Sequence, residues 1–319
     1  MALATTSPWS VDAIEGRVVR YADLRPCYNA FIDTRSPGSE SKENFTIIGP
    51  GVSENPDQHV HIAEPHGFNI GGARQPPGCV NSQHSHHTAE VFVVNSGEWR
   101  FDLGEHGDDA QVVLHPGDVI SLPTGMFRGF TNVGSDAGFL FAILGGDDPG
   151  RVLWAPQVFD MAAEFGLVLL ENGSLIDTAN GQSVPANSRP MPRTSPQQVI
   201  KLRRATTADA ARMVWRSAPC RPGDTTAIIG EYGPLNDPHP FRLDRLCLSK
   251  GAAEYRRTSA TAEVLFVHSG CAQVGWDGGE ITLNLSDTMT VPIGLEYNLS
   301  SNAEAVVYRV TGDKVSQPN

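Results

Sequence analysis

Three side chains in the first third of the chain have the types and spacing of a metal site. His84 and His86 are two residues apart, and Glu90 follows four residues after His86. In an extended strand, side chains of the same parity point to the same face, so these three share one face of a short segment. Two imidazoles and one carboxylate on one face can hold a divalent first-row metal ion and leave coordination positions open for substrate or oxygen. His87 has the opposite parity, and we expect it at the surface or behind the ligands, unless a local bulge turns it inward.

The alternative interpretation of this stretch is a polar patch on a solvated strand face. Three ligand types at this spacing, inside a frame formed by Gly78 and Gly97, make a metal site the better hypothesis. Metal binding needs neutral imidazoles and an ionised carboxylate, so it should weaken at acid pH. The ligand types do not select one ion, and we expect Fe²⁺ first, with Mn²⁺, Ni²⁺, Cu²⁺ and Zn²⁺ as alternatives.

The stretch Gly78–Gly97 resembles the first conserved motif of the cupin superfamily, and Gly117–Asn132 is similar to the second. The second stretch keeps the glycines, the proline and the asparagine of that motif at Gly117, Pro123, Gly125 and Asn132. The metal-binding histidine of the family's second motif is replaced here by Arg128. The resemblance implies a small double-sheet jelly-roll barrel, with a pocket inside the barrel and metal ligands on neighbouring strands.

Arg128 has two interpretations that the sequence leaves open. Its planar guanidinium can bind a substrate carboxylate through two hydrogen bonds close to the metal, which would make it a catalytic or substrate-binding residue alongside Glu90. It can instead form an internal ion pair that fills the place of the missing histidine. It cannot be a fourth metal ligand, because a guanidinium has no lone pair to offer. A buried arginine needs an acidic partner in either case.

The walls of the expected pocket follow from strand alternation. Phe92 continues the parity of Glu90, and Phe130 continues that of Arg128, so both aromatic rings should point inward. Phe139 and Phe141, on a later apolar stretch, are expected to extend the apolar wall that contacts the substrate. A mostly apolar cavity with a few polar groups is the usual form of a small-molecule site.

The elements around these residues indicate an all-β chain with short flanking helices. Short apolar alternations between turn signals recur from residue 45 to about 144, which favours antiparallel sheets closed into a sandwich or barrel. Residues 156–170 have near-helical spacing, with Gly166 as a stop. We therefore expect an irregular arm at 1–42 that reaches a second domain or subunit, a barrel at 43–170, a linker at 171–198 and a second barrel at 199–319.

The second half of the chain repeats the first without its metal ligands. Gly251 and Gly270 lie over Gly78 and Gly97 at one offset of 173 residues, and Glu263 then falls on Glu90. Arg257 and Ser259 stand where His84 and His86 stand in the first half, and Tyr297 falls on Arg128. We expect no metal chemistry in the second barrel and an Arg257–Glu263 ion pair inside it. The alternative is a binding cavity lined by Arg256, Arg257 and Tyr297.

The resemblance to bicupins, the two-barrel members of the family, implies an enzyme. They include dioxygenases of the quercetinase and gentisate types and oxalate decarboxylases. We expect a dioxygenase that oxidises a small aromatic or carboxylate substrate at the His84, His86 and Glu90 site. Two alternatives stay open: a redox-neutral isomerase, lyase or hydrolase that uses the ion as a Lewis acid, and a bicupin that binds a small molecule without chemistry.

Composition limits the partners and the location. The formal net charge of −12 argues against non-specific binding to nucleic acid or to anionic membranes. No apolar run is long enough to span a bilayer, and the first residues lack the pattern of a secretory signal. The five cysteines are scattered and do not resemble a disulfide framework, so we expect a reducing, cytoplasmic setting. The expected partners are a small-molecule substrate and a second copy of the chain in a homodimer.

Overall fold

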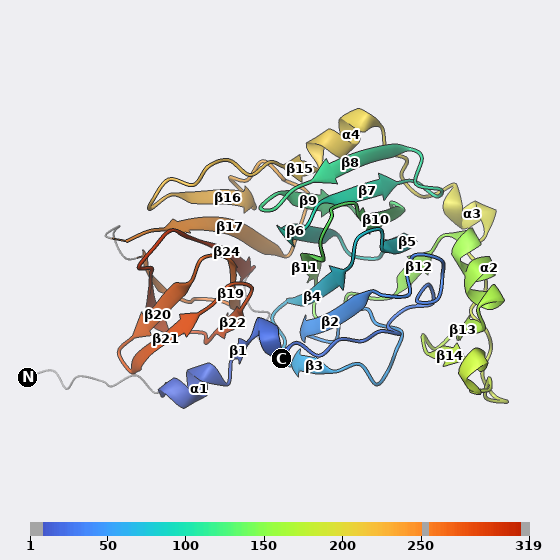
Figure 1. Ribbon diagram of the computed structural model, residues 1–319, viewed down its shortest axis with the longest axis horizontal. Helices are drawn as coiled ribbons and strands as arrows, with labels where there is room; N and C mark the ends of the chain where they lie inside the picture. The colour runs from blue at the N-terminus through green and yellow to red at the C-terminus, as the bar shows by residue number, and fades with distance from the viewer. Residues whose placement is uncertain (1–8, 251–254, 314–319) are drawn as a thin grey trace, which may run out of the picture. The chain divides into compact units, whose positions relative to one another are not determined.

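A computed structural model describes residues 9–250 and 255–313, which form two compact units (Figure 1). The first unit comprises residues 25–63 and 69–217, and we call it the N-terminal barrel. The second comprises residues 9–24, 64–68 and the described residues from 218 onward, and we call it the C-terminal barrel. The boundaries expected from the sequence at 42 and 198 do not coincide with this division, because residues 25–42 and 199–217 belong to the first unit.

The N-terminal barrel consists of two facing sheets in which antiparallel pairing predominates. The seven-stranded sheet has the order β15 (Val214–Trp215), β9 (Val119–Leu122), β6 (Glu90–Ser96), β11 (Gly138–Gly145), β4 (Phe68–Gln75), β2 (Glu43–Ile48) and β3 (Val60–Ile62). The five-stranded sheet has the order β12 (Val152–Trp154), β5 (Val80–His86), β10 (Arg128–Asn132), β7 (Trp99–Leu103) and β8 (Ala110–Leu114). The predicted all-β, double-sheet jelly roll is confirmed.

Alternation builds the core of this barrel. In β7 the residues Trp99, Phe101 and Leu103 are fully buried, whereas Arg100 and Asp102 between them are partly exposed and pair with each other. The buried rings pack against Phe92 and Phe130 from neighbouring strands. One face of β7 thus fills the barrel and the other meets water.

The segment 156–170, which has near-helical spacing, forms a helix followed by a short strand. Helix α2 spans Pro156–Glu164, with a proline at its first position. Gly166 has a φ of +76°, a left-handed conformation that ends the helix, as predicted. The chain then forms β13 (Leu167–Leu169), which pairs with β14 (Leu175–Asp177). The near-helical spacing beyond this stop produces no helix, because pairing across the hairpin decides the conformation of a short apolar run.

The remaining helices are short. In the N-terminal barrel they are η2 (Thr178–Asn180), α3 (Pro196–Val199) and α4 (Thr207–Arg212). In the C-terminal barrel they are α1 (Val11–Glu15) and η1 (Tyr21–Asp23). No helix of the described residues is long and apolar enough to cross a membrane.

The C-terminal barrel repeats the same architecture in the described residues. Its six-stranded sheet has the order β1 (Val18–Val19), β22 (Thr288–Val291), β19 (Glu263–Ser269), β24 (Ala305–Gly312), β17 (Phe241–Leu248) and β16 (Thr225–Ile229). Its four-stranded sheet has the order β18 (Tyr255–Thr258), β23 (Glu296–Ser300), β20 (Ala272–Trp276) and β21 (Gly279–Leu283). Strands β19 and β20 start 173 residues after β6 and β7, which is the offset found in the sequence. Gly251, which belongs to the same alignment, lies outside the described residues.

The start of the chain is ordered into the C-terminal barrel over residues 9–24. Ser10 caps α1, Ile14 is fully buried in the core of this unit, and β1 extends its larger sheet by pairing with β22. The expected irregular arm is thus partly regular over these residues. Arg20 anchors it by donating hydrogen bonds to Asp287 and to the carbonyl of Thr282.

The expectation that the cysteines form no disulfide is wrong. Cys220 and Cys247 are bonded to each other across 27 residues of sequence. The backbone explains their proximity, since Gly223 and Asp224 exchange hydrogen bonds with Cys247 beside the β16–β17 pair. Scattered spacing in the sequence could not reveal this contact. The argument from cysteine usage for a reducing compartment therefore no longer holds.

Candidate metal centre

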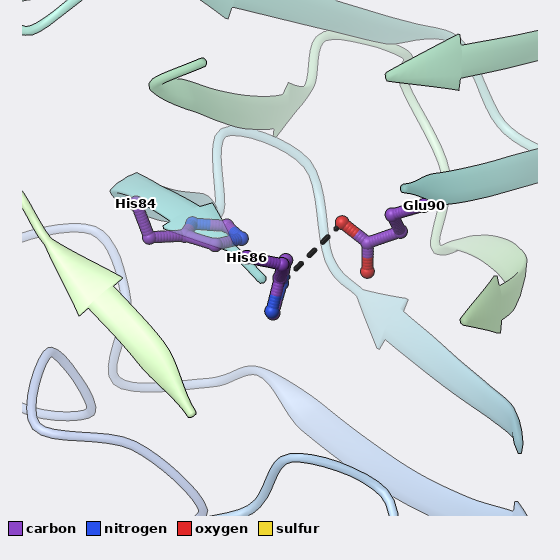
Figure 2. A group of neighbouring side chains, drawn as sticks. All are labelled: His84, His86 and Glu90. Atoms are coloured by element: carbon purple, nitrogen blue, oxygen red, sulfur yellow. Dashed lines mark ion pairs between the residues drawn. The ribbon is translucent and has the colours of Figure 1, made fainter. Parts of the chain in front are cut away.

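The structure brings His84, His86 and Glu90 together inside the N-terminal barrel. The two histidines are the last alternate residues of β5, and Glu90 begins β6, the next strand along the chain. Their candidate ligand atoms lie within 4.8 Å of one another, and the three residues are only 4%, 4% and 5% exposed. Figure 2 shows the carboxylate of Glu90 facing the imidazole of His86, with Nε2 and Oε2 3.4 Å apart. His87, of opposite parity, is exposed.

Each of the two imidazoles has a nitrogen that is available to bind a metal ion. His84 Nδ1 lies 2.7 Å from the carbonyl oxygen of Ser82, which can only accept, so Nδ1 carries the proton. The Nε2 lone pair of His84 is then free for an ion. His86 Nδ1 is buried and has no hydrogen-bond partner among the described residues. A buried polar atom without a partner costs free energy. Coordination of an ion by Nδ1 of His86 would offset part of that cost.

Burial sets the protonation state that a metal requires. It lowers the pKa of His84 to about 3, with the positive charge of Arg128 adding to the effect. Burial and the same arginine also hold the pKa of His86 well below its ordinary value. Both imidazoles are therefore neutral at neutral pH and available as ligands. Burial raises the pKa of Glu90, and the neighbouring Arg128 opposes that rise by favouring the carboxylate.

Arg128 is fully buried and pairs with the candidate ligand Glu90. Its Nη2 lies 2.9 Å from Oε2 of Glu90, and its Nη1 donates to the carbonyl of Met126 at 3.2 Å. It lies directly opposite His84 in the β10–β5 register. Arg128 is not among the residues that line the cavity beside the histidines. The arrangement is that of an internal ion pair in the place of a fourth ligand.

A cavity of about 70 Å³ opens beside the three ligands. Phe92 and Phe130 line it, as alternation predicted, together with Ala142, Leu144 and Trp154. Its polar lining, apart from the candidate ligands, includes Asn44, Thr46, Ser53, Gln58 and Asn81. Mostly apolar walls with a few polar groups form a small-molecule site, here one that holds only a few atoms.

Phe139 and Phe141 do not line this cavity, contrary to expectation. In the β6–β11 register Ala142 lies opposite Phe92, so Ala142 shares the cavity face. Phe141 lies opposite Val93 and belongs to the other face of the sheet. Every residue of β11 is buried, so hydrophobicity alone does not show which parity faces the pocket. The cross-strand register decides it.

Trp154 is a cavity residue that the sequence interpretation missed. It lies opposite His84 in the β12–β5 pair, and the two ring centroids are 5.5 Å apart. Its Nε1 donates to Oε1 of Glu54 at 2.6 Å, and the other oxygen of Glu54 accepts from Ile32 N at 2.8 Å. Burial raises the pKa of Glu54 to about 8. A tryptophan in a short apolar run before a helix carries no local sign of this role.

A fully buried ion pair supports the strand that carries the histidines. Lys42 and Asp33 pair with each other, and both side chains are 0% exposed. The second oxygen of Asp33 accepts a hydrogen bond from Ser82 N at 2.9 Å. Ser82 is the residue whose carbonyl orients His84. Both charged residues lie in the segment expected to be an irregular arm, where nothing in the sequence distinguishes them from surface charges.

The equivalent position in the C-terminal barrel holds an ion pair. The carboxylate of Glu263 lies 2.7 Å from Nε of Arg257, and the hydroxyl of Tyr297 also donates to it. The predicted Arg257–Glu263 ion pair is present. Among the described residues, His84, His86 and Glu90 form the only cluster that brings three candidate metal ligands together.

Comparisons with known proteins agree with this architecture. Residues 73–144 match the cupin domain family. Germin-like protein 5-1 of Oryza sativa subsp. japonica is 34% identical over 115 residues, which cover 35% of this chain and 49% of that protein. Germin-like protein subfamily 1 member 7 of Arabidopsis thaliana is 36% identical over 88 residues, covering 26% and 38%. The chain thus spans less than half the length of these relatives.

Solved structures with both barrels are similar in fold. A deletion mutant of Bacillus subtilis oxalate decarboxylase has a TM-score of 0.56 at 12% identity, covering 93% of this chain and 77% of that one. Vicilin from Capsicum annuum has a TM-score of 0.57 at 13% identity, covering 94% and 87%. At such identities the likeness concerns the fold alone. This chain thus contains a cupin domain at residues 73–144, and its described residues form two jelly-roll barrels.

Proposed function

We propose that this protein is a metal-dependent dioxygenase that acts on a small carboxylate at the cavity beside His84, His86 and Glu90. The observation that carries the proposal is a buried cluster of three ligands with an arginine in place of a fourth. Two histidines and one carboxylate leave several coordination positions of an ion open, which is the pattern of non-haem iron oxygenases. Both atoms of O₂ would enter the product, so the reaction needs no separate reductant.

The residues of the chain fit a bound divalent ion. His84 and His86 are held neutral by burial, and Glu90 is the anionic ligand. An ion such as Fe²⁺ held there would supply the electron transfer between substrate and oxygen, with Mn²⁺, Ni²⁺, Cu²⁺ and Zn²⁺ as alternatives for the same donors.

Arg128 favours an anionic substrate indirectly. Its positive charge already balances Glu90 at 2.9 Å, so a divalent ion would bring its full charge to the cavity. Among the described residues, no lysine or arginine lines the cavity, and its walls are mostly apolar. A carboxylate would therefore meet an uncompensated positive charge in surroundings of low polarity, where attraction is strong.

Cavity size favours an aliphatic over an aromatic substrate. An apolar cavity of about 150 Å³ is known to admit benzene. The cavity here measures about 70 Å³, and an ion would occupy part of that volume. A carboxylate of a few heavy atoms fits without displacement of Phe92, Phe130 or Trp154. Aromatic substrates of the quercetinase type would require those rings to move.

A redox-neutral lyase that removes CO₂ from a small dicarboxylate is the second candidate. The same small cavity favours it, and so does the likeness in fold to a protein named oxalate decarboxylase over 93% of this chain. In such a reaction Glu90 is the nearest carboxylate to handle protons, provided that Arg128 releases it. The two candidates differ in whether oxygen is consumed.

The first test is the metal content of untagged protein, measured by elemental analysis. We expect about one first-row ion per chain, lost in the double variant His84→Ala/His86→Ala. The matched control is His106→Ala/His115→Ala, which removes two exposed histidines of the same barrel and should retain the ion. If wild type takes up no ion even on titration, the enzyme proposal fails.

The second test measures oxygen uptake and CO₂ release with oxalate, glyoxylate and malonate, and with gentisate as an aromatic comparison. Uptake of O₂ with ¹⁸O in the product supports the dioxygenase. CO₂ release without net oxygen uptake supports the lyase. Turnover of gentisate but none of the aliphatic acids would contradict the argument from cavity size.

A further inference from the structure

The C-terminal barrel contains a cavity of about 560 Å³, much larger than the one beside the histidines. Strands β16, β17, β18 and β24 contribute to its lining, and residues 230–239 form part of its rim. Its interior presents Asp244, Arg257, Arg309 and Thr311, so its floor is charged and polar. All of these residues belong to one compact unit.

This cavity occupies the same place in its barrel as the metal cavity does in the first. Residues that line the two cavities occupy equivalent positions in the cross-strand registers of the two barrels. Thr311 lies opposite Glu263 as Leu144 lies opposite Glu90. The cross-strand pair Arg309–Leu265 corresponds to Ala142–Phe92. The pair Asp244–Ala227 corresponds to Gly71–Thr46. The pair Arg257–Tyr297 corresponds to His84–Arg128. Three small or apolar lining residues of the first barrel, Leu144, Ala142 and Gly71, are thus replaced in the second by Thr311, Arg309 and Asp244.

Hydrogen-bond donors are the groups left without partners in this cavity. Arg309 donates to Asp244 and Tyr255, yet its Nε is buried and has no partner among the described residues. The hydroxyl of Thr311 is also buried without one. Arg257 lies 2.7 Å from Glu263 through Nε, and this Nε is buried and makes no hydrogen bond to a described residue. The carboxylate of Asp244 accepts from Arg309. Glu263 accepts from Tyr297 and forms an ion pair with Arg257, although its Oε2 accepts no hydrogen bond from a described residue, and it is not among the residues that line the cavity.

We propose that the C-terminal barrel binds a small organic carboxylate directly through Arg257, Arg309 and Thr311, without a metal. A carboxylate supplies four acceptor positions to a floor whose unpaired groups are donors. Its binding would remove the cost of leaving those donors buried and unpaired. The rim carries Glu231 and Asp237, so a ligand with a hydroxyl or amino group at its other end fits better than a second anion there.

The inference does not rest on the proposed function of the N-terminal barrel. Binding is therefore measured in the His84→Ala/His86→Ala background, in which a carboxylate cannot bind through an ion at those histidines. Isothermal titration calorimetry of this full-length protein with lactate, malate and glycine gives the affinity of three acids. Glycerol serves as an uncharged probe that offers hydroxyls but no carboxylate.

We expect at least one of the three acids to bind and glycerol not to bind. Thr311→Val, which keeps the shape of the side chain, should weaken binding several-fold. Arg257→Met combined with Glu263→Gln removes the ion pair as a unit, so that no buried charge is stranded, and should weaken binding at least tenfold. Arg212→Ala, which removes an exposed arginine of α4 in the other barrel, should leave binding unchanged.

Three results would overturn the proposal. One is the absence of heat with every acid. Another is glycerol binding as tightly as the acids, which would indicate a polyol site. The third is an affinity that neither cavity variant changes while circular dichroism shows both to be folded.

Discussion

Arg128 determines the character of the N-terminal site. A guanidinium cannot coordinate a cation, so Arg128 adds no ligand to the cluster of His84, His86 and Glu90. The arginine instead compensates the charge of Glu90 in a fully buried position. The same residue thus adds no ligand of its own and favours the ionised form of Glu90, against the rise in pKa that burial causes.

Arg128→His should restore a fourth ligand. Residue 128 lies opposite His84 in the strand register, within the ring of residues around the cluster. We expect metal affinity to rise at least tenfold, measured by competition with a chromophoric chelator. Arg128→Gln, which removes the cation without adding an imidazole, is the matched control and should not bind more tightly. Equal affinity of the histidine variant and wild type would show that this position does not face the ion.

Asp33 is predicted to act as a positioning residue for His84. It accepts from Ser82 N, and the carbonyl of Ser82 in turn orients the imidazole. Asp33→Ala should lower metal affinity about 10- to 100-fold, the usual cost of losing support behind a ligand. It should also destabilise the protein by about 3–5 kcal/mol, because Lys42 is left buried and unpaired.

The double variant Asp33→Asn/Lys42→Met separates these two effects. Removal of both charges should recover most of the free energy of unfolding, and the asparagine oxygen can still accept from Ser82 N. Metal affinity should recover with it. A double variant that is stable but still binds metal weakly would mean that the charge of Asp33, and not its hydrogen bond, matters for the ligand.

At the scale of elements, strand register determines which side chains meet. Strand β5 is flanked by β10 and β12, which place Arg128 and Trp154 on either side of His84. Strand β11 faces the pocket with Ala142 and Leu144 and turns Phe141 away. A shift of the register by one residue would exchange these two faces completely.

The Cys220–Cys247 disulfide is an element-scale feature that we expect to stabilise the C-terminal barrel. Closing a loop of 27 residues restricts the unfolded chain and is worth about 3–4 kcal/mol in the chain-entropy model. Cys220→Ser/Cys247→Ser should lose about this much in urea denaturation, whereas Cys271→Ser, which removes a free thiol, should lose little. Alkylation of the unreduced, denatured protein should label three cysteines. Labelling of all five would contradict the bond.

At the scale of the whole molecule, the two barrels share one architecture but differ in the side chains that surround the buried glutamate of each. Both keep a buried glutamate at the start of the equivalent strand, Glu90 in β6 and Glu263 in β19. In the first barrel neutral imidazoles and apolar walls surround that glutamate. In the second, Arg257 and Tyr297 bind it within the barrel. Fold alone therefore does not assign the same activity to the two halves.

Buried Glu54 should make global stability depend on pH. Its folded pKa of about 8 lies above the ordinary value of 4.5. Between these values the folded state holds a proton that the unfolded state has released, so stability falls as pH rises. The slope from this group approaches about 1.4 kcal/mol per pH unit.

Urea denaturation of metal-free protein between pH 6.5 and 8 measures this contribution. Glu54→Gln should flatten the decline, although it lowers stability at every pH because one N–H donor loses its acceptor. Glu164→Gln, at an exposed position of α2, is the control and should keep the wild-type slope. An unchanged slope in the Glu54 variant would contradict a raised pKa for this carboxyl.

Local periodicity determined much of this protein from the sequence by itself. The spacing of His84 and His86 sufficed to place them on one face of a strand, because a period of two is a property of the extended chain. Glu90 was expected on the same strand face but begins β6 of the other sheet, so alternation along one strand does not explain its place beside the histidines. The repeat at one offset predicted the second barrel and the Arg257–Glu263 pair. Turn residues such as Gly166 ended elements where their backbone freedom predicted.

Only the tertiary structure decided the contacts that depend on register and on packing between distant segments. It showed that Arg128 pairs with Glu90, that Phe139 and Phe141 lie outside the cavity, and that Cys220 reaches Cys247. It also placed Asp33, Lys42, Glu54 and Trp154 around the histidine strand. These partners are tens of residues apart for the most part, and no local pattern encodes which strands meet or how their faces align.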